Sequence, residues 1–199
     1  MERFRCGAWA LSWLLVLGCT TSAPRPINGQ LASVLLRLEE RDQEARQGAQ
    51  ADPMNTNLRG TIQRIDRENR EELRAMIKQF GWPGRSLVGE PAAHAAWLIA
   101  QHADEEPAFQ KQCLQLMDSA PHGEVSAREL AFLTDRVLLA SGKPQRYGTQ
   151  FRQVGRRVVP EPMEEWKKVD SRRRKIGLPP LAQYARELQE LHNRQEGAR

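Results

Sequence analysis

Apolar residues recur every three or four positions along most of the chain beyond residue 30, and this spacing predicts amphipathic helices. The strongest stripe follows Asp52-Pro53 and ends at Gly81-Trp82-Pro83-Gly84; its members are Leu58, Ile62, Ile65, Leu73, Met76, Ile77 and Phe80. Shorter stripes predict further helices over residues 30–50, 91–102, 104–117, 126–142, 164–175 and 181–192. The pattern therefore predicts a mainly α fold, a compact multi-helix domain.

Polar residues at the starts of several stripes match helix N-terminal signals. Asp52 before Pro53 resembles an N-cap followed by a proline in the first turn, and Asp104 can cap the helix that follows it. Ser126 and Glu129 match a capping box, in which each side chain bonds the backbone N–H of the other residue. We therefore expect side-chain caps at these three helix starts.

The helical pattern stops at residue 142 and an irregular segment follows. Residues 142–151 (GKPQRYGTQF) combine two glycines, a proline and several hydrogen-bonding side chains, a composition typical of a loop. Residues 150–159 alternate weakly around Gly155, which allows one short β-hairpin that would need the helices for support. The loop 142–151 is therefore expected to be the central irregular segment of the domain.

The first residues have the features of an export signal. A short positively charged start precedes an apolar stretch over residues 8–18, which is too short for a membrane-spanning helix. The stretch ends in Val16-Leu17-Gly18-Cys19, which resembles the lipobox of bacterial lipoproteins. In that class Cys19 receives a diacylglyceryl group and becomes the mature N-terminus. The alternative is a plain secretory signal cleaved near Ala23.

These segments give an expected domain organisation. It comprises residues 1–18 as a lipoprotein signal peptide, 19–29 as the lipidated cysteine and a flexible tether, 30–50 as an amphipathic helix and linker, 52–192 as the helical domain, and 193–199 as a frayed tail. The first helix is only partly apolar, so we expect it to be dispensable for the fold. Cys19 would anchor the protein in the cell envelope. In a Gram-negative host Thr20 lacks the Asp that resembles an inner-membrane retention signal, so we expect the outer membrane, facing the periplasm.

Charge and cysteine content narrow the function classes. The chain has 199 residues, with 30 Lys and Arg against 25 Asp and Glu; removal of residues 1–18 takes away two of the former and one of the latter, leaving 28 against 24, a net charge of +4. Such a small excess could favour an anionic lipid surface but does not indicate nucleic-acid binding. Cys113 would then be the one cysteine besides Cys19, so no intramolecular disulfide is expected, and Cys113 is expected in the core.

No familiar cofactor or metal motif occurs in the sequence. It lacks His-Glu-x-x-His, Cys-x-x-Cys, a phosphate-binding glycine loop and a Gly-x-Ser-x-Gly turn, so neither a cofactor nor a metal is expected. A basic region is interleaved with acidic residues and is expected to form a solvated or membrane-facing surface; it consists of Arg156, Arg157, Lys167, Lys168 and residues 172–175.

Several short motifs resemble those of a known family. They are Gly81-Trp82-Pro83, residues 86–89 (SLVG), residues 101–104 (QHAD) with Gln110, residues 135–137 (DRV), residues 142–150 (GKPQRYGTQ), Asp170 with Arg172 and Arg173, residues 177–178 (GL) and Tyr184. In these motifs the chain resembles the bacterial family called domain of unknown function 6624, over residues 66–184. The resemblance implies a domain and a candidate site, but no reaction.

Two ionisable residues in these motifs are the main candidates for chemistry. His102 stands where one expected helix ends, and a helix C-terminus favours a protonated imidazole that could act as an acid. The alternative, that His102 caps the helix by bonding a free carbonyl group, stays open. Asp135 lies close to an apolar stripe, where a carboxylate must be paired or hydrogen-bonded. Its expected partners are backbone N–H groups of the loop 142–151 or Arg173, and this structural role is favoured over that of a catalytic acid.

The candidate site combines these residues with polar side chains of the loop and its flanking motifs. The candidate catalytic residues are His102, Asp135 and Tyr147. The candidate binding residues are Gln101, Asp104, Arg136, Lys143, Gln145, Thr149, Gln150 and Arg173. Irregular segments held by helices often carry binding residues. The alternative is that these side chains only satisfy the backbone of the loop itself.

Two functions are compatible with these features. The first is a lipid-anchored envelope protein that binds a polar ligand or a partner protein through the loop 142–151. The second is an envelope hydrolase that uses His102 and Asp135 as acid–base groups, with Tyr147 or Gln150 positioning the substrate. Convergence of these four side chains on an open pocket would favour the enzyme, whereas a closed and mutually satisfied set would favour binding or a structural role.

Overall fold

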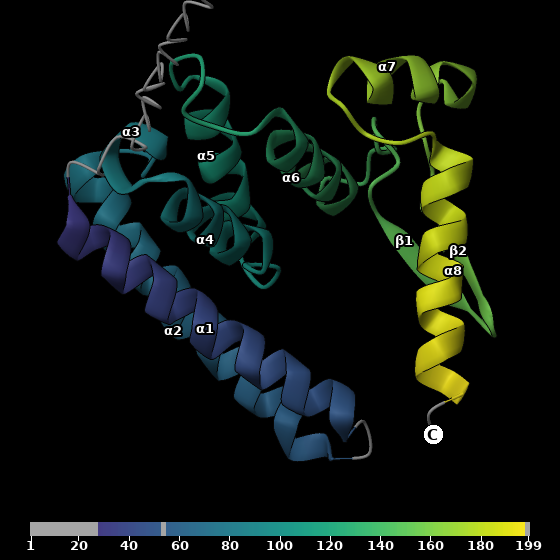
Figure 1. The fold of residues 1–199 in the computed structure, drawn as a ribbon, viewed down its shortest axis with the longest axis horizontal. Helices are drawn as coiled ribbons and strands as arrows, with labels where there is room; N and C mark the ends of the chain where they lie inside the picture. Colours follow the sequence, from purple (N-terminus) through teal and green to yellow (C-terminus); the bar gives the residue numbers. More distant parts are fainter. Residues whose placement is uncertain (1–27, 53–54, 198–199) are drawn as a thin grey trace, which may run out of the picture.

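The computed structural model describes residues 28–52 and 55–197, and within them the chain is mainly helical, as the hydrophobic pattern predicts (Figure 1). Two long helices are followed by shorter ones, then by a small antiparallel sheet and a last long helix. The elements are α1 (Gly29–Ala51), α2 (Thr56–Phe80), α3 (Arg85–Val88), α4 (Glu90–Gln101), α5 (Pro107–Asp118), α6 (Ala127–Ala140), β1 (Phe151–Val154), β2 (Arg157–Pro160), the 3₁₀ helix η1 (Trp166–Lys168), α7 (Val169–Lys175) and α8 (Leu181–Gly197).

A hydrophobic core joins the helices from α1 to α6. Side chains that are almost completely shielded from solvent come from five of these helices; they are Leu35, Leu73, Ile99, Phe109 and Leu133. Cys113 of α5 is also fully buried, as expected, and burial raises the pKa of its thiol to about 12. The spacing of three and four that the sequence shows is therefore the spacing of the buried faces.

The first helix belongs to this core, which corrects the expected start of the folded domain at residue 52. Leu31, Leu35 and Leu38 of α1 are buried, and α1 packs along both α2 and α4. Its charged residues do not mark it as separable, because most of them lie on the other faces of the helix and Asp42 is itself buried. The signal peptide, Cys19 and the tether before residue 28 lie outside the described residues.

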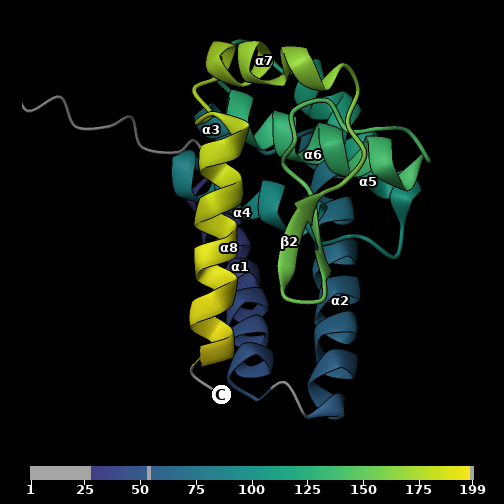
Figure 2. The same ribbon diagram turned by 90° about the vertical axis from the view of Figure 1, so that its right-hand side faces the viewer.

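The C-terminal part forms a smaller layer beside the helical body (Figures 1 and 2). The expected hairpin is present: β1 and β2 pair antiparallel, with Phe151 opposite Pro160, and Gly155 in the turn has φ +58°. Helix α8 lies along β2, where the side chain of Gln189 accepts from Val158 N and donates to the carbonyl oxygen of Arg156, both at 2.9 Å. Helix α8 continues to Gly197, past residue 193, where the sequence suggested that a frayed tail begins.

The three expected helix caps are not formed as the sequence suggested. Ser126 precedes α6 but its side chain makes no capping hydrogen bond, and the side chain of Glu129 pairs with His94. The N-cap of α2 is Asn55 rather than Asp52, and α5 begins after Glu106 rather than Asp104. Two of the side chains assigned to these caps make tertiary contacts instead, Glu129 with His94 and Asp104 with Arg136. None of the helices in the described ranges is both long and apolar enough to cross a bilayer.

Candidate functional site

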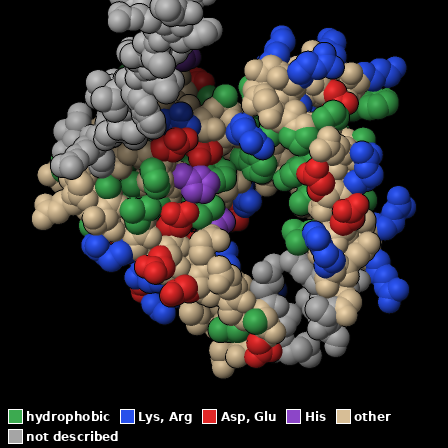
Figure 3. Space-filling view, viewed as in Figure 1, with side chains coloured by type: hydrophobic (Ala, Val, Ile, Leu, Met, Phe, Trp, Pro, Cys, Tyr) green, Lys and Arg blue, Asp and Glu red, His purple; other side chains and the backbone are tan. Residues whose placement is uncertain are grey.

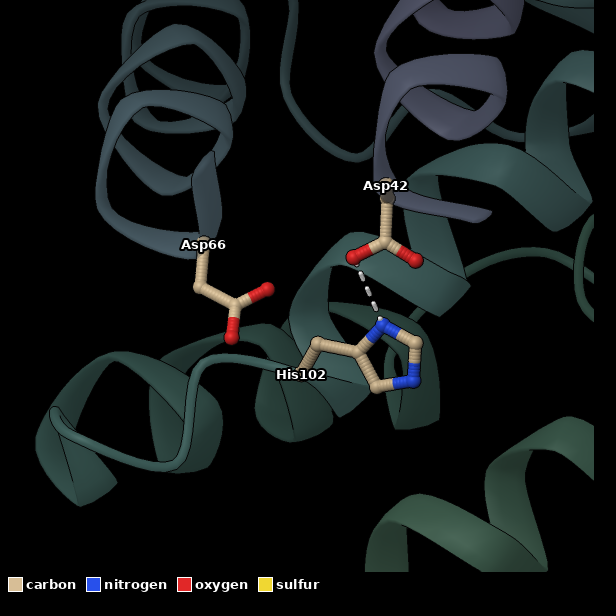
Figure 4. A group of neighbouring side chains, drawn as sticks. All are labelled: Asp42, Asp66 and His102. Carbon is tan, nitrogen blue, oxygen red and sulfur yellow. Dashed lines mark hydrogen bonds and ion pairs between the residues drawn. The ribbon is translucent and has the colours of Figure 1, made fainter. Parts of the chain in front are cut away.

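His102 lies at the end of α4, where it meets carboxylates from two other helices (Figure 4). Its Nδ1 atom is 3.0 Å from Oδ1 of Asp42 on α1, and Asp66 approaches from α2. Asp42 is only 2% exposed, whereas the side chain of His102 keeps 19% of its surface in contact with solvent. Three helices that are distant in sequence thus bring two carboxylates and an imidazole together.

Arg46 of α1 connects the members of this cluster. Its Nη2 atom donates to Oδ1 of Asp42 at 3.1 Å and to Oδ1 of Asp66 at 2.5 Å. Its Nε atom lies 3.2 Å from either oxygen of Asp42 and 3.1 Å from Nδ1 of His102. We define the His102 cluster as Asp42, Arg46, Asp66 and His102.

The proton on His102 is assigned by the hydrogen bonds around its ring. Nδ1 cannot donate to Asp42 and accept from Arg46 at the same time. Arg46 Nε already has Asp42 as an acceptor, so a proton on Nδ1 satisfies all three side chains. The Nε2 atom then makes no hydrogen bond with any residue in the described ranges, although it is not shielded from solvent. An imidazole held through Nδ1 by a carboxylate leaves Nε2 free to accept a proton.

The pKa values of the two carboxyl groups in the cluster are shifted in opposite directions. Burial raises the pKa of Asp42, but hydrogen bonds from His102 and Arg46 outweigh it and lower the pKa from 3.8 to about 2. Burial also raises the pKa of Asp66, and the attraction of Arg46 does not cancel that rise. Asp42 is therefore the member of the pair that holds its negative charge most firmly.

Acid should weaken the folded protein through Asp42. A lowered folded-state pKa contributes stability above the unfolded value of 3.8, and this stability is lost as pH falls towards about 2. We expect Asp42 to contribute about 2 kcal/mol in this way, so the difference in unfolding free energy between wild type and Asp42→Asn should shrink by that amount between about pH 5 and 2. Asp66, whose pKa is raised, works against the loss, because its contribution is present at low pH and disappears as pH rises through its folded-state pKa. Urea unfolding at each pH measures the effect.

Glu40→Gln is the control for this experiment, because Glu40 is exposed on the same helix. Its difference from wild type should stay constant over the same pH range. A constant difference for Asp42→Asn as well would contradict a firmly ionised Asp42.

The cluster also contains three groups of a kind that bind metal ions. Ligand atoms of Asp42, Asp66 and His102 lie within 4.8 Å of one another, a grouping that sequence reasoning did not foresee when it expected no metal. However, the guanidinium group of Arg46 contacts all three side chains. A metal ion would have to displace this cation, so the arrangement fits an internal ion-pair cluster better than a metal centre.

Asp135 lies in a different place and holds the loop 142–151. Its carboxylate is fully buried and accepts from Arg146 N at 2.7 Å, Tyr147 N at 2.9 Å, Thr149 N at 2.9 Å and Thr149 Oγ1 at 2.9 Å. The prediction that loop N–H groups would be its partners is confirmed. The carboxylate has no remaining free oxygen surface and acts as a structural anchor for the loop.

Other polar residues of the loop are also engaged within the fold. Gln145 is fully buried; its Nε2 donates to the carbonyl oxygens of Gln150 and Glu161, and its Oε1 accepts from Gln150 N, all at 2.9 Å. The Arg173 side chain donates to the carbonyl oxygens of Tyr147 and Gly148 at 2.7 and 3.0 Å. Burial lowers the pKa of Arg173, and electrostatic interactions with Tyr184, Asp170 and Asp135 offset this lowering only in part. Most polar side chains of this segment therefore bond backbone groups of the loop itself, which was the alternative to a binding role.

The side chains of the remaining candidate residues are not part of this hydrogen-bonded set. Asp104 pairs with Arg136 at 2.7 Å on the surface, and Lys143 is exposed. Gln101 is buried, and its Oε1 accepts no hydrogen bond from the part of the chain that the structure describes. Tyr147 is half-buried and lines a groove together with Arg146. The other residues of this groove are Leu114, Gln115, Asp118, Ala127, Leu130, Ala131, Thr134 and Ile176.

The structure thus separates residues that the sequence placed in one site. No hydrogen bond or ion pair within the described ranges joins His102 to Asp135; the first pairs with Asp42 and Arg46, the second with the loop. Sequence reasoning missed Asp42, Arg46 and Asp66. Asp42 and Arg46 are four residues apart on one helix, so their pairing was visible in principle, but the contact with His102 spans 60 residues.

Comparison with known proteins gives one significant result. No curated protein and no solved structure matches the chain significantly. The model of a family described as "Family of unknown function (DUF6624)" matches residues 29–195, which is most of the chain and begins at the first residue of α1. This match includes the first helix, both strands and nearly all of α8, in agreement with the extent of the fold. The chain therefore belongs to the family of unknown function DUF6624.

Proposed function

We propose that the protein is a lipid-anchored envelope protein whose domain carries out general acid–base chemistry at His102, acting as a hydrolase on a component of the envelope. The observation that supports the chemistry is the contact between the buried Asp42 carboxylate and His102 Nδ1, which leaves Nε2 available. This pairing replaces the His102 and Asp135 pair that the sequence suggested. The lipobox ending at Cys19 supports the anchor, and Thr20 supports the outer membrane in a Gram-negative host.

Each residue of the His102 cluster has a role in the proposed reaction. His102 Nε2 takes a proton from a water molecule while the water oxygen attacks the electrophilic centre of the substrate. The bond to the leaving group breaks, and the imidazolium returns the proton to that group. Asp42 keeps the ring oriented through Nδ1 and stabilises the imidazolium, as a buried carboxylate does in hydrolytic triads. Arg46 holds Asp42 in place, and Asp66 in turn holds Arg46.

His102→Gln tests this proposal. The amide keeps a polar group at the position but cannot carry a proton back and forth, so turnover should fall by about 10²–10⁴-fold. We suggest incubating the purified protein with isolated envelopes of the bacterium that encodes it, and identifying released fragments by mass spectrometry. Complementation of a gene deletion gives a second measure.

His94→Gln is the matched control, because His94 is on the same helix and pairs with Glu129 on the surface. It should release the same fragments as wild type. A folded His102→Gln protein that works as well as wild type in both assays would exclude the acid–base role.

A second candidate function, binding of a polar ligand or partner protein at the loop 142–151, is supported by the groove beside Tyr147 and Arg146. These two side chains are not part of the hydrogen-bonded interior of the loop. They line this groove together with Thr134 and Ile176. If Tyr147→Ala fails to complement while His102→Gln succeeds, the groove rather than the His102 cluster is the functional site.

A further inference from the structure

Helix η1 presents a large aromatic side chain to solvent. Trp166 is 66% exposed, the highest value among the exposed large hydrophobic residues of the described ranges. Glu165 before it has φ +38°, a left-handed conformation that is uncommon for a residue other than glycine. The chain thus turns at Glu165 immediately before the residue that remains outside the core. A single exposed tryptophan does not by itself mark a contact surface, so its surroundings decide whether this is one.

Lys and Arg residues are frequent in the segment that contains this tryptophan. Residues 164–175 contain six Lys and Arg against three Asp and Glu. Lys167, Arg174 and Lys175 are exposed, and none of them makes an ion pair with any residue that the structure describes. The space-filling view shows Lys and Arg side chains gathered over α7 (Figure 3). A tryptophan among unpaired cations matches the chemistry of an anionic membrane interface.

The N-terminal end of the domain lies on the same side of the molecule. Asn28 N donates to the carbonyl oxygen of Leu87 at 2.9 Å, so the chain enters the fold at α3. A groove lined by Arg85 of α3, by His122 and Arg128, and by Ile176 after α7 connects the two regions. Both ribbon views show α3 and α7 towards the top, opposite the turn between α1 and α2 and the C-terminus (Figures 1 and 2).

The chain between the proposed anchor and the fold is short. Eight residues lie between Cys19 and Asn28, and the nine steps of chain from one to the other span at most about 32 Å when fully extended. The anchor therefore keeps α3 within about that distance of the lipid surface. The edge formed by α3, η1 and α7 can therefore meet the membrane with no rearrangement of the fold.

We propose that this edge lies against the membrane, with Trp166 in the headgroup region and Lys167, Arg174 and Lys175 against anionic lipid headgroups. The proposal rests on the lipid anchor at Cys19. It adds an orientation: η1 and α7 face the lipid, while the end of α8 points away from it. A domain held only by a lipid anchor would otherwise have no fixed orientation at the membrane surface.

A fluorescent probe at single introduced cysteines tests the orientation. Cys113 is fully buried with its pKa raised to about 12, and Cys19 is occupied by lipid, so a thiol probe labels the new cysteine selectively. The lipidated full-length protein is labelled as Trp166→Cys or as Leu191→Cys, which is 46% exposed near the far end of α8. Each is reconstituted into phosphatidylethanolamine–phosphatidylglycerol vesicles that contain nitroxide-labelled lipid.

The probe at position 166 should be quenched at least about threefold more than the probe at position 191, because only the first lies in the headgroup region. Adding Lys167→Glu and Lys175→Glu to the Trp166→Cys protein should reduce this quenching, and so should phosphatidylcholine vesicles or about 1 M salt, at which charge interactions reach only about 3 Å.

Equal quenching at the two positions in protein that floats with the vesicles would overturn the orientation and leave the anchor intact. Quenching at position 166 that stays the same in the Lys→Glu variants, in uncharged vesicles and at high salt would overturn recognition of anionic headgroups. Protein that does not float with the vesicles would show instead that the anchor itself is absent.

Discussion

Asp135→Asn is expected to lower the unfolding free energy by about 3–5 kcal/mol, the cost of breaking a buried charged hydrogen-bond network. The carboxylate accepts from three backbone N–H groups and one hydroxyl of the loop 142–151. An asparagine keeps one acceptor oxygen but turns an NH₂ group towards these donors. The change also removes a negative charge that favours the buried guanidinium group of Arg173. In a domain of this size the melting temperature should fall by about 10–15 °C.

Asp104→Asn provides the comparison for this variant. Asp104 is 60% exposed and pairs with Arg136, the residue next to Asp135 on α6. Loss of this surface ion pair should cost no more than about 1 kcal/mol of unfolding free energy. Thermal melts of both purified variants give the measurement. An Asp135→Asn protein that melts together with Asp104→Asn would show that the loop holds its shape without the buried carboxylate, and would reopen a catalytic role for Asp135.

Leu35→Ala should cost about 2–5 kcal/mol, because Leu35 of α1 is fully buried and its truncation leaves a cavity among α1, α2 and α4. Unfolding in urea should show a lower midpoint with an unchanged slope. This result would place the first helix energetically within the domain, as it is structurally.

The adjacent residue supplies an internal control for the same helix. Leu36 is 41% exposed, so Leu36→Ala changes helix propensity and size in the same way but removes little buried surface. Its cost should stay below about 1 kcal/mol. If the two variants are equally stable, α1 contributes nothing to the core, and a chain starting at residue 52 should then fold by itself.

Features that depend on neighbouring residues were predictable from the sequence. The long stripe of α2 and the turn at Gly155 are local, and both are present in the structure. The partners of Asp135 were also predictable, since a carboxylate near an apolar stripe needs donors and the loop 11–14 residues further on offers backbone N–H groups. Local spacing and the cost of burial are sufficient for such inferences.

Features that depend on tertiary contacts were not predictable in this way. The role of α1 in the core follows from its packing on α4, which lies many residues later in the chain. The reciprocal bond of the capping box expected at Ser126 is missing, because Glu129 bonds His94 from another helix. His102 was a candidate for its position at a helix end, but nothing in the local sequence links it to Asp42, 60 residues away.

The way in which Asp135 holds the loop 142–151 has a consequence for how this protein can change over evolution. Apart from the hydroxyl of Thr149, the donors are backbone N–H groups, which every amino acid except proline has. The path of the loop is therefore nearly independent of the side chains at positions 146 and 147. Gly148 is the exception, since it has φ +66° and an added Cβ atom would lie 2.8 Å from Leu181. Side chains facing the groove can thus change while Asp135, together with Gln145 and Arg173, preserves the shape of the loop.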